Sequence, residues 1–235
     1  ILEDFKKAGI HTQYILTSES EETGQAFITV DEAGQNTILV YGGANMTLSA
    51  TDVEMSAEAF IGADFVVAQL EVPFEAIEQA FKIARKQNIT TVLNPAPAIE
   101  LPKSLLELTD IIIPNETEAE LLTGISINNE SDMKETATYF LDLGISAVLI
   151  TLGEQGTYCA YQEQYKMIPA CNVKAIDTTA AGDTFIGAFL SELNKDLSNL
   201  ESAIRLANQA SSLTVQRKGA QASIPTRKEV EAEYN

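Results

Sequence analysis

Short apolar runs alternate with helical patterns through most of the chain, and this alternation restricts the fold more than any other feature of the sequence. Residues 64–69, 90–93, 110–113 and 147–151 have the length and composition of strands. The run at 147–151 is almost continuously apolar, as in a parallel strand that is buried on both faces. Because strands separated by helices form parallel sheets, the sequence predicts an α/β fold with a mostly parallel sheet and helices on both faces.

Helical patterns lie between and after these strands. They are expected at 73–87, 115–122, 132–143, 183–193 and 200–215. Residues 157–161 and 164–168 are predicted to form a hairpin on the edge of the sheet. In such sheets the ligand site lies beyond the carboxyl ends of the parallel strands, and segments that are polar or rich in Pro and Gly follow four of the predicted strands.

The first part of the chain has a different pattern, in which apolar and polar residues alternate between turn signals. Residues 13–17, 25–30 and 37–41 predict three strands, and residues 32–36 predict the turn between the last two. An antiparallel sheet this small is not stable alone. We therefore expect a β-sheet lid that is attached to a larger body.

The predicted lid covers residues 11–44, and residues 1–10 and 45–235 are expected to form the α/β domain. The opening residues have a helical pattern that ends at Gly9. The glycine pair at 42–43 predicts a bend rather than a phosphate-binding loop. The lid is also expected to provide the surface of a homodimer.

The charge balance restricts the partners. The 34 acidic and 15 basic residues give a net charge of −19, which argues against nucleic acid and anionic membranes as partners. Cys159 and Cys171 form no disulfide or metal pattern, and we expect them to be reduced packing residues of a cytoplasmic protein. His11 is the single histidine, so a Ser-His-Asp site or a histidine-rich metal site is not expected.

The chemistry is concentrated in the string Asp-Thr-Thr-Ala-Ala-Gly-Asp-Thr-Phe at 177–185, which lies between a strand-like run at 173–176 and a helical pattern. Small residues at 180–182 allow a ligand close to the backbone, and the first N–H groups of a helix bind anions. Asp183 lies beside these groups, where its carboxylate could accept a proton from a hydroxyl group. The alternative is a simple capped helix, with Asp177 or Thr179 as the cap.

This string resembles the C-terminal signature of the ribokinase (PfkB) family of sugar kinases, D-T-x-G/A-A-G-D-x-F, with Ala180 at the first variable glycine position. The resemblance extends over nearly the whole chain and implies a ribokinase-like fold. It implies ATP-dependent phosphorylation of D-ribose at O5, which gives ribose 5-phosphate. Asp183 would be the base, and the N–H groups of Ala181, Gly182 and Asp183 would form an anion hole for the γ-phosphoryl group.

Asn115 and Glu118 have the spacing of a capping box. The family resemblance implies that this Asn-x-x-Glu motif also lies near the nucleotide phosphates and a magnesium ion, which Glu118 would reach through water. Both roles are compatible with each other.

The resemblance implies roles in ligand binding for one further segment and two further residues, and the segment and one of the residues also have a structural alternative. Thr151-x-Gly153-x-x-Gly156 is by itself a strand followed by a turn, but in the family this loop binds ATP. Asn208 resembles a residue that lines the adenine pocket. Glu71 precedes a helix that Pro73 begins, where a solvated acid is ordinary, but by resemblance it contacts the sugar.

A potassium site is implied by two further segments. On charge alone, Arg217-Lys218 is a solvated basic pair. The resemblance implies K⁺ ligands near the anion loop, with backbone carbonyls contributed at 214, 217 and 219. The residues concerned are Asp177, Thr179, Thr214, Arg217, Gly219 and Ser223.

The sequence departs from the family at its beginning. The family starts with a strand that carries a sugar-binding Asn/Asp pair, followed by a Gly-Gly-Lys-Gly-type segment, and neither occurs here. The chain opens at Ile1 within a helical pattern, so we expect an N-terminally truncated chain. The alternatives to ribose phosphorylation are another sugar or nucleoside kinase of the family (fructokinase-like), an inactive nucleotide-binding fragment, or a non-catalytic binding protein on the same fold.

Overall fold

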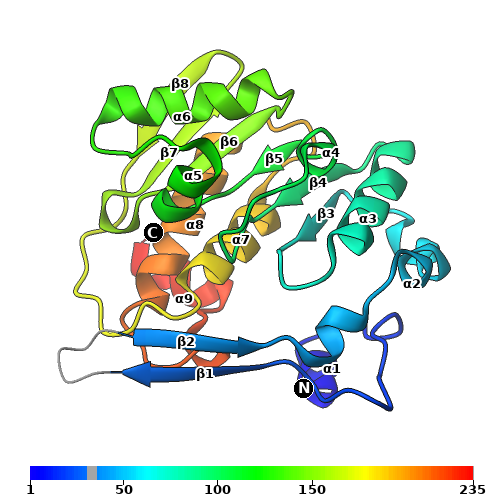
Figure 1. Ribbon diagram of the computed structural model, residues 1–235. Helices are drawn as coiled ribbons and strands as arrows, with labels where there is room; N and C mark the ends of the chain where they lie inside the picture. The colour runs from blue at the N-terminus through cyan, green and yellow to red at the C-terminus, as the bar shows by residue number, and fades with distance from the viewer. Residues whose placement is uncertain (31–35, 235) are drawn as a thin grey trace.

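A six-stranded mixed sheet forms the centre of the computed structural model, which describes residues 1–30 and 36–234 (Figure 1). The strands pair in chain order, and the first four are parallel. The last two form an antiparallel hairpin on the edge. These strands are β3 (Phe65–Ala68), β4 (Thr90–Leu93), β5 (Ile111–Ile112), β6 (Ala147–Thr151), β7 (Thr157–Tyr161) and β8 (Gln164–Ile168). The expected α/β fold with a mostly parallel sheet is confirmed.

Helices cover both faces of this sheet. One face packs against α7 (Ala181–Glu192) and α8 (Leu200–Thr214). The other face packs against α3 (Phe74–Lys86), α5 (Glu116–Thr123) and α6 (Glu130–Asp142). Helices α2 (Ala50–Met55), α4 (Lys103–Leu106) and α9 (Arg227–Tyr234) were not predicted from the sequence. The first of them has a detectable signal, because Ser49 and Asp52 form a capping box at its start.

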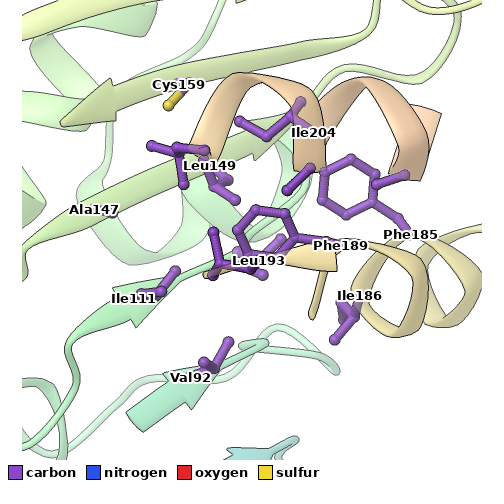
Figure 2. Packing of buried hydrophobic residues seen from close by; sticks show 14 of the residues in the cluster. Val92, Ile111, Ala147, Leu149, Cys159, Phe185, Ile186, Phe189, Leu193 and Ile204 are labelled. Carbon is purple, nitrogen blue, oxygen red and sulfur yellow. The ribbon is translucent and has the colours of Figure 1, made fainter. Parts of the chain in front are cut away.

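Successive strand residues point to opposite faces, so each strand contributes to two cores. Figure 2 shows the core between the strands and α7, where Val92, Ile111 and Leu149 face Phe189 and its neighbours. Phe185 and Phe189 lie one helical turn apart and stack with ring centroids 6.1 Å apart. These contacts fix α7 against the sheet, and the residues at 181–183 begin that helix.

The smaller sheet is antiparallel and lies apart from the larger one (Figure 1). It pairs β1 (Gln25–Val30) with β2 (Asn36–Tyr41), as predicted. The turn expected at 32–36 lies outside the described residues, except for Asn36. A 3₁₀ turn, η1 (Gly43–Thr47), then bends the chain away from β2, and the chain is crowded there because a Cβ on Gly43 would lie 2.3 Å from the Glu22 carbonyl oxygen.

Two predicted strands are wrong. Residues 13–17 form no strand, because β1 pairs with β2 instead and the Ile15 N–H donates to the Thr12 carbonyl in a turn. Residues 173–176 form no strand either. There the N–H of Ile176 donates to the Val215 carbonyl at 2.7 Å, so the segment attaches to the end of α8 rather than to a sheet.

The remaining elements begin and end within two residues of their predicted bounds, apart from a few short turns. The opening helix, α1 (Leu2–Lys7), ends beside Gly9, whose φ of +79° matches the predicted stop. None of the described helices is long and apolar enough to cross a membrane.

Candidate active site

A cavity of about 180 Å³ lies at the carboxyl ends of β3 to β6, where the fold predicts a ligand site. The strand ends contribute part of its polar wall, and the starts of α5 and α7, with the turn before α7, contribute the rest. The lining residues are Gln69, Asn94, Ala96, Ile113, Asn115, Glu118, Thr151, Thr178, Ala180, Ala181, Gly182, Asp183, Phe185 and Ile186. The predicted residues Asn115, Glu118, Thr151, Ala181, Gly182 and Asp183 therefore meet in one place.

The N-terminus of α7 opens into this cavity. The preceding residue, Ala180, has φ +61° and ψ +11°, a left-handed conformation that is costly for a residue with a Cβ. The Ala181 N–H donates to the Thr178 carbonyl at 3.2 Å, whereas the N–H groups of Gly182 and Asp183 have no backbone acceptor among the described residues. Two of the three N–H groups predicted for the anion hole are therefore available, and the third is occupied within the loop.

The turn that precedes α7 is held in place by α8. Ser211 donates its hydroxyl hydrogen to the Ala181 carbonyl at 2.9 Å, and Thr214 does the same to the Thr184 hydroxyl at 3.0 Å. Asp183 is exposed and lines the cavity beside the free N–H groups. This arrangement places a carboxylate next to an anion-binding helix terminus.

Asn115 and Glu118 form the complete capping box of α5. The Asn115 carboxamide oxygen accepts the Glu118 N–H at 2.8 Å, and the Glu118 carboxylate accepts the Asn115 N–H at 2.8 Å and its Nδ2–H at 2.9 Å. Burial raises the pKa of the Glu118 carboxyl, and the hydrogen bond from the Asn115 N–H opposes that shift. The structural role is thus present, and both side chains also line the cavity.

The predicted ATP loop divides into two parts. Thr151 lines the cavity, and its N–H donates to the Pro114 carbonyl at 2.9 Å. Gly153 is exposed, has φ +53°, and has open space around it. Gly156 is buried with φ +112°, and a Cβ there would lie 2.2 Å from the Ile168 carbonyl oxygen. Gly156 therefore has a structural reason to be glycine, whether or not it also contacts a nucleotide.

Two predicted ligand residues lie outside the cavity lining. Asn208 is buried on α8, where its Oδ1 accepts the Thr157 hydroxyl at 2.9 Å. Its Nδ2 donates to the carbonyls of Ile168 and Pro169 at 3.1 and 3.2 Å. Glu71 is exposed in the turn after β3. The adenine contact of Asn208 and the sugar contact of Glu71 stay predictions.

Asp177 connects the turn before α7 to the segment after α8. Its Oδ1 accepts the Thr179 N–H and its Oδ2 accepts the Gly219 N–H, both at 3.0 Å. These contacts, led by the Gly219 hydrogen bond, lower the pKa of Asp177 to about 2. The carboxylate is therefore charged at neutral pH. Asp177, Thr179 and Gly219, which are three of the six predicted potassium ligands, are thus in contact with one another through this side chain.

The other three predicted potassium ligands have different partners. The Thr214 carbonyl accepts the Arg217 N–H at 3.0 Å, and the Arg217 guanidinium pairs with Glu229 at 2.7 Å. The Ser223 hydroxyl donates to the Ala220 carbonyl at 2.6 Å. Arg217 is thus paired rather than merely solvated, and the carbonyl oxygen of Thr214 already accepts one hydrogen bond.

Two further polar residues of the cavity wall, Gln69 and Asn94, belong to the strand-end segments that the sequence places at the ligand rim, although it predicts no specific role for either. Their signal was their position, because each is the first residue after a parallel strand. A larger hollow, of about 670 Å³, lies at the opposite ends of the strands. Its cations are already paired, Arg85 with Asp110 at 3.0 Å and Lys195 with Asp64 at 3.7 Å.

Residues 1–227 match the family described as pfkB family carbohydrate kinase. Ribokinase of Staphylococcus aureus is 64% identical over 230 residues, which are 98% of this chain and 76% of that protein. Ribokinase of Haemophilus influenzae is 44% identical over 96% of this chain and 73% of its own length. The structure of Arabidopsis thaliana ribokinase complexed with ribose and ATP has a TM-score of 0.85 at 33% identity, covering 95% of this chain and 73% of that one. The chain therefore belongs to the pfkB family of carbohydrate kinases.

Proposed function

We propose that this protein transfers the γ-phosphoryl group of ATP to O5 of D-ribose, giving ribose 5-phosphate, ADP and a proton. The observation that carries the proposal is the position of Asp183, whose carboxylate lies beside the free N–H groups at the start of α7. Its relatives add support, because the two named above are ribokinases and a similar solved structure is a complex with ribose and ATP.

In the proposed reaction Asp183 accepts the proton of the 5-hydroxyl while O5 attacks the γ-phosphorus. The bond between the γ-phosphorus and the β–γ bridging oxygen breaks, and ADP leaves. The N–H groups of Gly182 and Asp183 hold the charge on the transferring phosphoryl group. Such transfers depend mainly on positioning and charge stabilisation, and a fixed helix terminus provides both.

Magnesium fits the chemistry of the cavity. Its described lining includes two carboxylates, Glu118 and Asp183, but no lysine or arginine. The phosphates of ATP therefore need a cation to be neutralised there. Glu118 would hold Mg²⁺ through water, since Mg²⁺ keeps several waters and few protein ligands. When bound, the ion would neutralise the phosphates.

A panel of acceptors tests the proposed function. Initial rates of ADP formation should be measured with ribose, 2-deoxyribose, fructose and a nucleoside, next to equilibrium binding of ATP. The proposal requires the highest kcat/KM for ribose. A higher value for fructose or for the nucleoside would favour another sugar or nucleoside kinase. ATP binding without turnover of any acceptor would favour a binding protein.

Gly182 allows a matched test of the anion site. A Cβ at Gly182 or at Gly187 would meet no described residue outside its own helix within 4 Å, and both residues are exposed on α7. Gly182→Ala should lower kcat/KM about tenfold or more, because its Cβ occupies space beside the phosphate-binding N–H groups. Gly187→Ala should leave the rate unchanged. Equal rates for the two variants and the parent would exclude a phosphate at this helix terminus.

Potassium is proposed to order the turn before α7, because Asp177 joins Thr179 to Gly219 through its two carboxylate oxygens. We expect activation by K⁺ when rates are compared with those in Na⁺ and Tris at matched ionic strength. The same rate in all three salts would remove the proposed ion site.

Residues 11–44 remain the proposed bounds of the lid. We propose that two copies of the protein form a homodimer through the sheet of this lid. Its strands expose Phe27, Leu39 and Val40, which are 53%, 69% and 54% accessible. Phe27 and Leu39 are cross-strand partners and lie on one face. Leu39→Lys should therefore shift the sedimentation coefficient from dimer to monomer. A parent protein that sediments as a monomer at micromolar concentration would contradict this interface.

We also propose a cytoplasmic location, which is supported by the free thiols of Cys159 and Cys171. Fractionation of cells that express the protein tests this, and recovery outside the cytoplasm would exclude it.

A further inference from the structure

Asn94 extends the sheet beyond the ends of its strands by means of its side chain. Its backbone N–H donates to the Ala68 carbonyl at 3.0 Å, in continuation of the ladder between β3 and β4. Its Nδ2 donates to the Ile113 carbonyl at 2.8 Å, and its Oδ1 accepts a hydrogen from the Gln69 Nε2 at 2.9 Å. One carboxamide thus connects the ends of three strands at the wall of the cavity.

The Ile113 carbonyl fixes the orientation of both carboxamides. A carbonyl oxygen can only accept, so the Asn94 atom that faces it must be Nδ2. The Asn94 Oδ1 then faces Gln69 and can only accept, so the Gln69 atom that faces it must be Nε2. A flip of either amide would place two acceptors or two donors against each other. The carbonyl oxygen of Gln69, Oε1, is therefore left out of this chain of hydrogen bonds.

The charges of the cavity indicate what Oε1 binds. Gln69 lines the cavity together with the carboxylates of Glu118 and Asp183, and no lysine or arginine is among the described lining residues. An anionic oxygen of a phosphate would be repelled by a carbonyl oxygen in such surroundings. An O–H group is a suitable partner, since it can donate one hydrogen bond to Oε1.

We infer that Gln69 accepts a hydrogen bond from an O–H group of the bound substrates and that Asn94 is the positioning residue that orients it. This inference rests on the proposed kinase function. The O–H group has two possible sources, a hydroxyl of the acceptor sugar and a water molecule of the hydrated magnesium ion. Both sources share the chemistry, and steady-state kinetics separates them.

The primary test is Gln69→Met, which keeps the length of the side chain and removes both the carbonyl oxygen and the NH₂ group of the amide. Gln79→Met is the matched control, because the Gln79 Nε2 also donates to one side-chain oxygen, that of Glu54 at 2.9 Å, on the exposed surface of α3. We expect kcat/KM to fall about tenfold in the Gln69 variant, the weight of one hydrogen bond, and to stay unchanged in the control. Both variants should melt close to the parent.

The kinetic parameter that changes identifies the source of the O–H group. A higher KM for ribose with an unchanged Mg²⁺ activation midpoint assigns it to the sugar. A higher Mg²⁺ midpoint with an unchanged KM for ribose assigns it to metal-bound water. Either result supports the inference. Parameters within twofold of the parent in an active enzyme would overturn it, whereas an inactive parent protein would count against the proposed function instead.

A second variant tests the role of Asn94 without changing Asn94, which holds three strands. In Gln69→Glu an ionised carboxylate cannot donate to the fixed Asn94 Oδ1, but a protonated carboxyl can. The ratio of its kcat/KM to that of the parent should therefore rise as the pH falls from about 8 to about 6, because the facing acceptor favours the protonated form. A ratio that is independent of pH would mean that Asn94 does not orient this side chain.

Discussion

Asp183→Asn should lower kcat by about a hundredfold or more, which is the usual contribution of a positioned general base. Asparagine has nearly the same shape but cannot accept the proton of the sugar hydroxyl at neutral pH. The affinity for ATP should change little, because the N–H groups at the start of α7 belong to the backbone and remain in place. Single-turnover and steady-state rates measured beside equilibrium ATP binding check both statements.

The matched control for this variant is Asp142→Asn, which makes the same chemical change at the exposed last residue of α6. It should leave both kcat and ATP affinity unchanged. If Asp183→Asn turned over within a few-fold of the parent, Asp183 would not be the base. If the variant lost activity and ATP binding together, the carboxylate would act in nucleotide binding rather than in proton transfer.

Gly156→Ala should destabilise the fold by about 3 kcal/mol or more, which combines overpacking with backbone strain. The added Cβ would lie 2.2 Å from the Ile168 carbonyl oxygen and 2.5 Å from the Ala170 nitrogen. Both are backbone atoms and cannot rotate away. The φ of +112° and ψ of −134° also lie where residues with a Cβ are rare. The midpoint of urea unfolding measures this loss.

Gly153 provides the comparison, because it lies three residues earlier in the same loop. It has φ +53°, but a Cβ there meets nothing within 4 Å. Gly153→Ala should therefore cost about 1 kcal/mol, the strain of the left-handed conformation alone. Equal losses for the two variants would show that crowding at Gly156 is relieved by movement of the β8 end. In that case the glycine would need another explanation.

The sheet was predictable because its strands carry an unambiguous pattern. The segments β6, β7 and β8 have the predicted bounds, since each is a short apolar or alternating run between turn residues. The start of α5 was equally clear, because its capping box is encoded by two residues at fixed spacing. These predictions succeed because each depends only on residues that are close to one another in the sequence.

Features that depend on distant partners were not predictable in the same way. Residues 13–17 alternate like a strand but pair with no strand among the described residues, and no local signal reports that. The amide of Asn208 binds Thr157 and two carbonyls that are about forty to fifty residues away, and no local signal reports these contacts. Its adenine contact, which the resemblance implies, stays a prediction. The positions of Gln69 and Asn94 after two parallel strands place them at the ligand rim, but no local signal reports that their side chains are hydrogen-bonded to each other.

The most direct test of the proposed function is the ³¹P NMR spectrum of the product formed from ribose and ATP. A phosphate on O5 lies next to two hydrogens on C5, so the phosphorus signal is split into a triplet. A phosphate on O1 lies next to a single hydrogen and gives a doublet. We predict a triplet that appears together with an equal amount of ADP. In the Asp183→Asn variant the same signal should appear much more slowly. A doublet, or ADP without any new phosphate ester, would contradict transfer to O5.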